Sequence, residues 1–167
     1  MDTGDFLLGK RVRQNHALEH ATVTLLTRRT PALSVSARSN TRGFIIFADL
    51  DTALVEDAAR EALARLRAGE SELAIHPNCG TNLAVGMSLA LVGSLFALTA
   101  LRPRTRVASA LASSVAGIMV ARPLGEIVQR HVTTSPDLSN VRLGSVRSRR
   151  LFGRRVVEVC TSTDLGR

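Results

Sequence analysis

Two histidines and a glutamate stand close together near the start of the chain. The stretch "NHALEH" places His16 and His20 four residues apart, with Glu19 directly before the second histidine. On a helix, residues four apart project from the same side on successive turns, so both imidazoles can bind one zinc ion. Glu19 then lies one residue back, where its carboxylate can take a proton from a zinc-activated water molecule. The pattern predicts a catalytic zinc site, and the alternative is a hydrogen-bonded polar cluster or a solvated polar stripe.

A second group of candidate residues lies in "LAIHPNCGTN", where His76 and Cys79 flank a Pro-Asn turn. A thiol near a helix N-terminus and an imidazole favours its thiolate form, which binds metals and is nucleophilic. Zinc held by His16, His20 and one of these two residues keeps a coordination position for water. If all four residues bind the zinc, the site is closed to water and its role is structural or sensing. Thiol chemistry at Cys79 without a metal is the third alternative.

Helices and a hairpin must position these residues. Residues 10–29 contain no Gly or Pro and place apolar residues on two opposite sides of a helical wheel, which predicts a helix covered on both sides. Residues 32–50 alternate around "SNTRG" and predict a β-hairpin, and residues 52–69 predict an amphipathic helix. Glu70 and Glu72, just beyond that helix, are further acidic ligand candidates.

Two later segments are apolar enough to cross a bilayer. Residues 83–101 contain no charged residue over nearly the ~20 residues that a transmembrane helix needs, and Thr81 or Asn82 is the expected N-cap. Residues 107–121 are shorter and cross fully only if the helix tilts little or if Leu124 and Ile127 extend it past Pro123. We expect a transmembrane helical hairpin, and two buried helices of a soluble core are the alternative. Small residues four apart, which let helices pair in lipid, are Gly86 and Ala90, Ala112 and Ala116, and Ser113 and Gly117.

The expected fold class is α+β, a small helix and β-hairpin domain interrupted by the transmembrane hairpin. An N-terminal part, 1–81, carries the "HALEH" helix, and the membrane hairpin covers 82–128. In the C-terminal part, 129–167, strands near 141–149 and 154–162 predict a second β-hairpin, which joins the N-terminal sheet.

The chain is strongly basic, with a net charge of +8 that comes almost wholly from arginine. Such a charge suits anionic lipid or nucleic acid. Tyr and Trp are absent and aromatic residues total 3%, so the stacking platforms of single-stranded RNA recognition are missing and lipid is favoured over nucleic acid. The expected partners are membrane lipids, a peptide or protein substrate, and a second copy of the chain through the small-residue faces. The run "RSRRLFGRR", residues 147–155, is either a solvated basic face or a contact for anionic headgroups.

The set "NHALEHAT", "RSNTRGF" and "LAIHPNCGTNLAVG" resembles a family of small bacterial membrane proteins without an established function, over about the first two thirds of the chain. Locally, "HALEH" resembles the H-x-x-E-H motif of pitrilysin-type metallopeptidases, the inverzincins. That resemblance implies zinc ligands at His16 and His20 and a general base at Glu19. That family takes its third ligand from a downstream glutamate, and the corresponding distance here falls in an apolar segment without an acid. We expect a zinc metallopeptidase in the bacterial inner membrane, crossing it twice, with its soluble parts in the cytoplasm.

Overall fold

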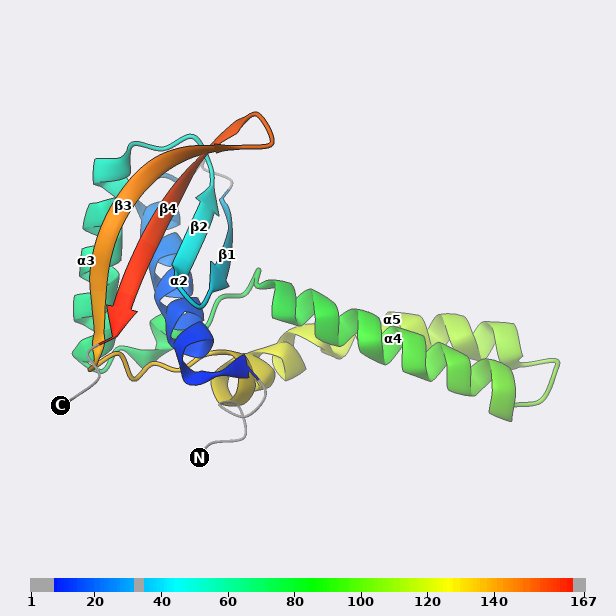
Figure 1. The fold of residues 1–167 in the computed structure, drawn as a ribbon. Coiled ribbons are helices and arrows are strands. Elements are labelled where there is room, and N and C mark those ends of the chain that lie inside the picture. The colour runs from blue at the N-terminus through cyan, green and yellow to red at the C-terminus, as the bar shows by residue number, and fades with distance from the viewer. Residues whose placement is uncertain (1–7, 32–34, 164–167) are drawn as a thin grey trace. The chain divides into compact units, whose positions relative to one another are not determined.

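The chain divides into two compact units in the computed structural model, which describes residues 8–31 and 35–163. The first unit consists of Met1–His76 together with Arg130–Arg167, and the second consists of Pro77–Gln129. The second unit is thus an insertion in the sequence of the first. Each unit has its own packing and is described separately, with the element labels of Figure 1.

The first unit is a four-stranded antiparallel sheet with two helices. Its strand order is β1-β2-β4-β3. The C-terminal hairpin, β3 and β4, therefore pairs with the N-terminal hairpin, β1 and β2, through β2 and β4. Together with the two helices of the second unit, this confirms the expected α+β class. The elements of the first unit are α2 (Lys10–Arg29), β1 (Ser36–Asn40), β2 (Gly43–Phe47), α3 (Thr52–Arg67), the 3-10 turn η1 (Ser71–Ala74), β3 (Val141–Leu151) and β4 (Arg154–Thr163); a π-helical turn η2 (Gln129–Thr133) leads back into it.

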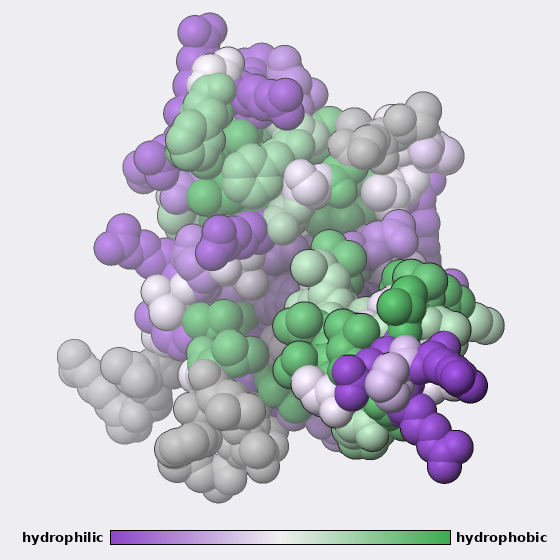
Figure 2. All heavy atoms as spheres, turned by 90° about the vertical axis from the view of Figure 1, so that its right-hand side faces the viewer, coloured by the Kyte–Doolittle hydropathy of each residue, from purple (hydrophilic) through white to green (hydrophobic). Residues whose placement is uncertain are grey.

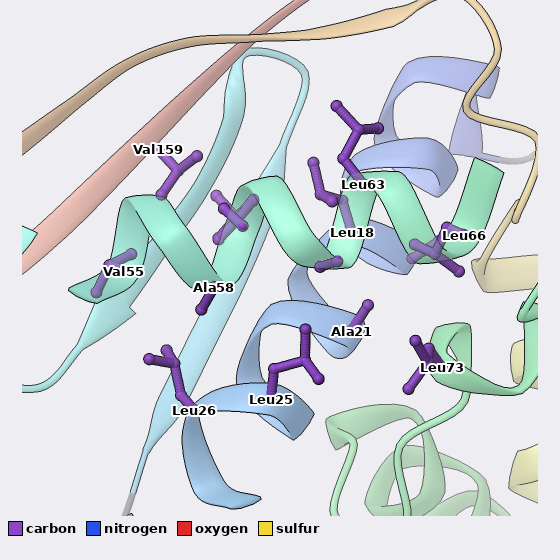
Figure 3. Close-up of a cluster of buried hydrophobic side chains, with 14 of the residues drawn as sticks. Leu18, Ala21, Leu25, Leu26, Val55, Ala58, Leu63, Leu66, Leu73 and Val159 are labelled. Atoms are coloured by element: carbon purple, nitrogen blue, oxygen red, sulfur yellow. The ribbon is translucent and has the colours of Figure 1, made fainter. Parts of the chain in front are cut away.

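Both helices pack on the sheet, and they also pack against one another. Helix α2 contacts β1 and β2, whereas α3 contacts β3 and β4. Figure 3 shows the apolar side chains that these layers bury. Helix α2 is buried on nearly every side, as its two apolar stripes predict, so its polar residues are also taken out of water. The core includes Leu18, Ala21, Leu25 and Leu26 of α2, Val55, Ala58, Leu63 and Leu66 of α3, Leu73 of η1 and Val159 of β4.

A glycine allows β2 and β4 to approach at the start of their pairing. Gly43 follows the two-residue turn of the first hairpin and has a φ of +145°, a conformation that residues with a side chain rarely adopt. A Cβ atom built there would lie 1.9 Å from the carbonyl oxygen of Val159. The predicted turn at "SNTRG" is confirmed, with the Asn40 side chain accepting a hydrogen bond from Arg42 N at 2.7 Å. Leu33, part of the expected alternation, lies outside the described residues.

The second unit is a pair of helices, α4 (Gly80–Ala100) and α5 (Arg106–Val128), packed through small residues. Ideal Cβ atoms at Gly86, Gly93 and Gly117 would lie within 3 Å of Ala121, Ser113 and Ala90, respectively. Ser94 donates a hydrogen bond across the pair to the Ala110 carbonyl at 3.1 Å. Small residues thus face the partner helix, as expected for Gly86, Ala90 and Gly117. Ala112 and Ala116 are exposed instead, because they lie on another side of α5.

Large apolar side chains cover the outside of this pair. Figure 2 shows them gathered over the helical hairpin, with hydrophilic side chains at its tip. Both α4 and the helix that runs from Arg106 to Thr133 are long and apolar enough to cross a membrane. The exposed residues include Leu83, Met87, Leu91, Val92, Leu95, Phe96, Val107, Leu111, Val115, Ile118 and Met119. An apolar exterior around a small-residue interior is the arrangement that lipid favours.

Polar groups hold the ends of α4 and α5 together. Helix α4 begins earlier than expected, since the N-cap is Cys79 rather than Thr81 or Asn82. Asn82 instead donates to the Pro77 carbonyl at 2.7 Å and accepts a hydrogen bond from Gln129 at 2.7 Å. This link lies beyond Pro123 and joins the C-terminal end of α5 to the start of α4.

Candidate metal centre

Helix α2 carries buried polar side chains among its apolar ones. Glu19 and His20 are buried, with exposed fractions of 6% and 3%, and His16 is half-buried. A polar side chain is stable inside a protein only where partners replace the water that it has lost. The contacts of these three residues therefore decide what the cluster can do.

Backbone carbonyls orient both histidines. Nδ1 of His16 lies 2.9 Å from the carbonyl oxygen of Thr133, and Nδ1 of His20 lies 2.7 Å from that of Ala74. A carbonyl oxygen only accepts hydrogen bonds, so each Nδ1 is the donor and carries the ring proton. In the neutral ring the lone pair is then on Nε2. Metal-ligating histidines have this arrangement, because the bonded nitrogen fixes the tautomer and the ring orientation.

The two rings lie side by side on successive turns of α2. Their centroids are 4.2 Å apart, and the candidate ligand atoms of His16 and His20 lie within 4.8 Å of one another. Two nitrogen ligands of one tetrahedral zinc are roughly 3.4 Å apart, because each Zn–N bond is about 2.05 Å long. The separation of the two histidines is thus compatible with a single metal ion between them.

One ion pair ties together the two turns that orient the histidines. Ala74 ends η1 and Thr133 ends η2, and the side chain of Glu72 in η1 accepts hydrogen bonds from Arg130 in η2 at 3.0 and 3.1 Å. The Arg130 guanidinium holds the pKa of Glu72 below its usual range. Both histidine orientations therefore depend on the same pair of short turns.

The two acidic candidates upstream of His76 bind arginines. Glu70 accepts hydrogen bonds from Arg65 at 2.9 and 3.0 Å, which lower the pKa of Glu70, and Glu72 binds Arg130 as described above. Guanidinium groups thus occupy the oxygens of both carboxylates. We assign neither glutamate a ligand role.

Glu19 is a buried carboxylate with an unsatisfied oxygen. Burial raises its pKa, and the nearby His16 and hydrogen bonds with Ser39 offset part of that effect. Its Oε2 atom is buried without a hydrogen-bond partner among the described residues. Such exceptions are rare in folded proteins and often have a catalytic explanation. The candidate base lies close enough to His16 to interact with it electrostatically, and one of its oxygens can accept a hydrogen bond.

His76 joins the two histidines of α2. Its ring centroid lies 5.7 Å from that of His20, and the side chain is half-buried. Burial lowers the pKa of His76, and the neighbouring His20 lowers it further, so the neutral, metal-binding form is favoured. The remaining histidine, His131, lies in η2, where its backbone carbonyl accepts a hydrogen bond from Arg13 at 3.2 Å.

Cys79 belongs to the second unit, where it caps α4. Its sulfur accepts a hydrogen bond from the backbone N–H of Thr81 at 3.4 Å. Because Cys79 follows His76 by three positions along the chain, the Cα atoms of the two residues can be at most about 11 Å apart. Chain connectivity therefore keeps this thiol near His76.

The sequence patterns did not indicate the groups that orient the cluster. Ala74 and Thr133 act through their carbonyl oxygens, which every residue has, so their side chains give no signal. The position of Ser39 could be suspected from the sequence pattern. Residues two apart on a strand lie on the same side, so Ser39 shares the side of β1 that carries Ala37, and Ala37 packs against the core.

Residues 11–146 match a domain of unknown function, DUF6391. The chain belongs to this family. It is also similar to an uncharacterised protein of Picosynechococcus sp., with 36% identity over 150 residues that cover 81% of this chain and 73% of the relative. No solved structure matches the chain. The expectation of a family without an established function is confirmed, and the metallopeptidase resemblance stays a prediction.

Proposed function

We propose that the chain is a membrane-anchored zinc protein with hydrolase chemistry, in which Nε2 atoms of His16 and His20 bind the metal. The observation that carries this proposal is the pair of bonds from Nδ1 to the carbonyls of Thr133 and Ala74. In the metal-binding form of each ring, these bonds leave the lone pair on Nε2. A hydrogen bond from the other ring nitrogen orients a zinc-ligating histidine and makes it a stronger ligand.

Glu19 supports an enzyme over a purely structural site. Oε2 of Glu19 is buried without a partner among the described residues, so this oxygen can accept a proton from a water molecule. Zinc, when bound, would lower the pKa of a water molecule and polarise a substrate carbonyl. Glu19 would take the proton from that water and pass it to the leaving group. A peptide bond of a peptide or protein is the simplest substrate for these parts.

The third ligand is His76 or Cys79. His76 lies beside His20, and its lowered pKa favours the neutral ring. Cys79 supplies a soft sulfur ligand that zinc accepts equally well. One of the two leaves a position for water, whereas both together close the site and favour a structural or sensing role.

The second unit supports anchoring in a membrane. Its two helices expose large apolar side chains and pack through glycines, which is the arrangement expected in lipid rather than in water. We propose that both helices cross the bacterial inner membrane and that the first unit lies in the cytoplasm. Cleavage would then take place near the bilayer surface.

Zinc content tests the proposal directly. The full chain is purified in detergent, reconstituted with zinc, dialysed and subjected to elemental analysis, as wild type and as His16→Ala and His20→Ala. We expect about one zinc per wild-type chain and a loss of most of it in both variants, because each removes one of only three or four ligands. His131→Ala is the matched control, since it removes a histidine outside the cluster and should keep the zinc.

A wild-type chain without zinc would refute the proposal, and so would an equal loss in His131→Ala. Circular dichroism of every variant separates metal loss from unfolding. His76→Ala and Cys79→Ser then identify the remaining ligands. Loss of zinc affinity in only one of them supports an open site, whereas loss in both supports the closed site.

A further inference from the structure

The turn between β3 and β4 places a phenylalanine where the chain would favour a smaller polar residue. Phe152 and Gly153 form a two-residue loop, with φ values of +50° and +76°. Two positive φ values are typical of a type I′ turn, in which Asn-Gly is preferred. A bulky residue is an outlier in this left-handed region. Phe152 is also 95% exposed, so neither the backbone nor burial in the fold explains the side chain.

Apolar surface continues beneath this turn. A cavity of about 660 Å³ lies between the end of β2 and the turn, and Phe47, Leu151 and Val156 give it apolar walls. Phe47 is itself 38% exposed. Two of the five phenylalanines of the chain therefore lie at one end of the sheet and are at least partly open to solvent.

Arginines surround the same turn in excess over carboxylates. We use the name basic tip for residues 147–155, which include five arginines. Arg149 binds Glu158 at 3.0 Å and Arg155 binds Asp49 at 3.2 Å. The other three, which are Arg147, Arg150 and Arg154, have no ion pair among the described residues. The basic tip thus keeps an uncompensated positive charge around an exposed apolar side chain.

We propose that the basic tip binds the surface of an anionic lipid bilayer, with Phe152 inserted among the acyl chains and the arginines on the headgroup phosphates. Guanidinium groups bind phosphate through two parallel hydrogen bonds. A single apolar residue at the end of a rigid hairpin and flanked by cations fits an interface that is apolar below and anionic above. The proposal needs no metal and concerns a part of the first unit away from the histidine cluster in sequence.

The absence of tryptophan from the chain allows a direct test. Phe152→Trp introduces a single tryptophan at the proposed insertion point of the full-length protein. The protein is reconstituted into vesicles of phosphatidylcholine alone or of an equal mixture with phosphatidylglycerol. Emission wavelength and quenching by brominated acyl chains then report whether residue 152 enters the apolar layer.

We expect the emission to move to shorter wavelength and to be quenched in the anionic vesicles only. Adding Arg150→Ser and Arg154→Ser to the reporter variant should abolish both effects, and 1 M salt should weaken them, since it shortens the Debye length to about 3 Å. Unquenched emission at the wavelength of exposed tryptophan in both vesicles overturns the proposal. Equal quenching in both vesicles overturns the charge recognition.

Two further variants keep the outcome interpretable. Phe96→Trp places the reporter on the exposed side of α4, where quenching in both vesicles tests membrane insertion of the second unit separately. Quenching at residue 96 without quenching at residue 152 would support membrane insertion of the second unit and refute the basic-tip proposal. Phe152→Asn should keep or raise the melting temperature, because asparagine tolerates the left-handed turn. A lower melting temperature would instead assign Phe152 a structural role.

Discussion

Glu19 is held in an environment that opposes its charge. The carboxylate is 94% buried by its neighbours, and burial raises its pKa above the ordinary value. A neutral amide is cheaper to bury than a carboxylate. We therefore expect a glutamine of the same size at this position to stabilise the fold more than Glu19 does.

Glu19→Gln separates the chemical role of this residue from a structural role. We expect the zinc content to stay at the wild-type level and hydrolysis of any cleaved peptide to fall by roughly 10²-fold or more, because a general base is lost. We also expect the metal-free variant to melt at a higher temperature than the metal-free wild type. Elemental analysis, a peptide cleavage assay and differential scanning calorimetry measure the three effects. A lower melting temperature together with zinc loss would make Glu19 a structural residue or a ligand.

At the scale of residues, spacing alone predicted which side chains of α2 come together. His16 and His20 face the same way because a helix repeats after nearly four residues. The approach of His76 could only be suspected, since no local pattern relates it to residues that lie 56 and 60 positions earlier. The carbonyls of Ala74 and Thr133 were beyond prediction, because backbone groups have no signature in the side-chain sequence.

At the scale of elements, the pairing of β2 with β4 depends on Gly43, which has no side chain. Gly43→Ala would force a methyl group against the carbonyl of Val159 and impose a strained φ. We expect a loss of about 3 kcal/mol or more in the free energy of unfolding of the first unit, measured by urea denaturation in detergent.

Gly69→Ala is the control for this substitution. Gly69 also has a positive φ, of +97°, but a Cβ there would meet no atom within 4 Å. Its substitution should cost only about 1 kcal/mol, from the backbone alone. Equal losses in the two variants would show that the close approach of β2 and β4 contributes nothing.

The helical hairpin depends on Gly117 in a comparable way. A Cβ there would lie 2.7 Å from the backbone nitrogen of Ala90, so Gly117→Leu must push α4 and α5 apart. We expect a loss of about 1–3 kcal/mol in the stability of the pair, as for other overpacked interfaces. The measurement is the loss of helical circular dichroism during titration with sodium dodecyl sulfate.

Ala116→Leu is the matched control, because Ala116 is the adjacent residue and is exposed. It should leave the titration midpoint unchanged. A midpoint that falls equally in both variants would mean that the side of α5 carrying Ala116 also makes a contact, which self-association would supply.

Periodicity predicted the elements themselves well, whereas their ends depended on contacts between distant residues. The expected helix at 10–29 and strands at 141–149 and 154–162 agree closely with α2, β3 and β4. Helix α5 runs seven residues past the apolar segment 107–121, and the link between Asn82 and Gln129 joins its C-terminal end to the start of α4. Such a link joins residues 47 positions apart and has no local pattern.

At the scale of the whole molecule, β4 completes the sheet from its middle. It lies between β2 and β3, and it contributes Val157 and Val159 to the core. A chain that ends after residue 140 therefore loses two strands, and β2 keeps β1 but loses β4, the second of its two partners. We expect this truncated chain to leave α2 unprotected in amide hydrogen exchange, because Val157 and Val159 of β4 belong to the same buried cluster as Leu18 and Leu26 of α2.

A chain that ends after Thr163 is the control and should protect α2 as the wild type does. It retains all four strands, since β4 ends at this residue. Wild-type protection of α2 in the shorter chain would show that the helix is stable without the second hairpin, contrary to the packing described above.

The insertion of the second unit between the two halves of the first also sets an order of events during synthesis. A ribosome releases α2, β1 and β2 first, then both apolar helices, and only at the end the ten residues of β4. Until then β2 has one unpaired edge, which is open to pairing with other chains. The apolar helices thus leave the ribosome before the sheet can close. A delay in burying these helices would expose an unpaired strand and two apolar helices at the same time, which favours aggregation of the unfinished chain.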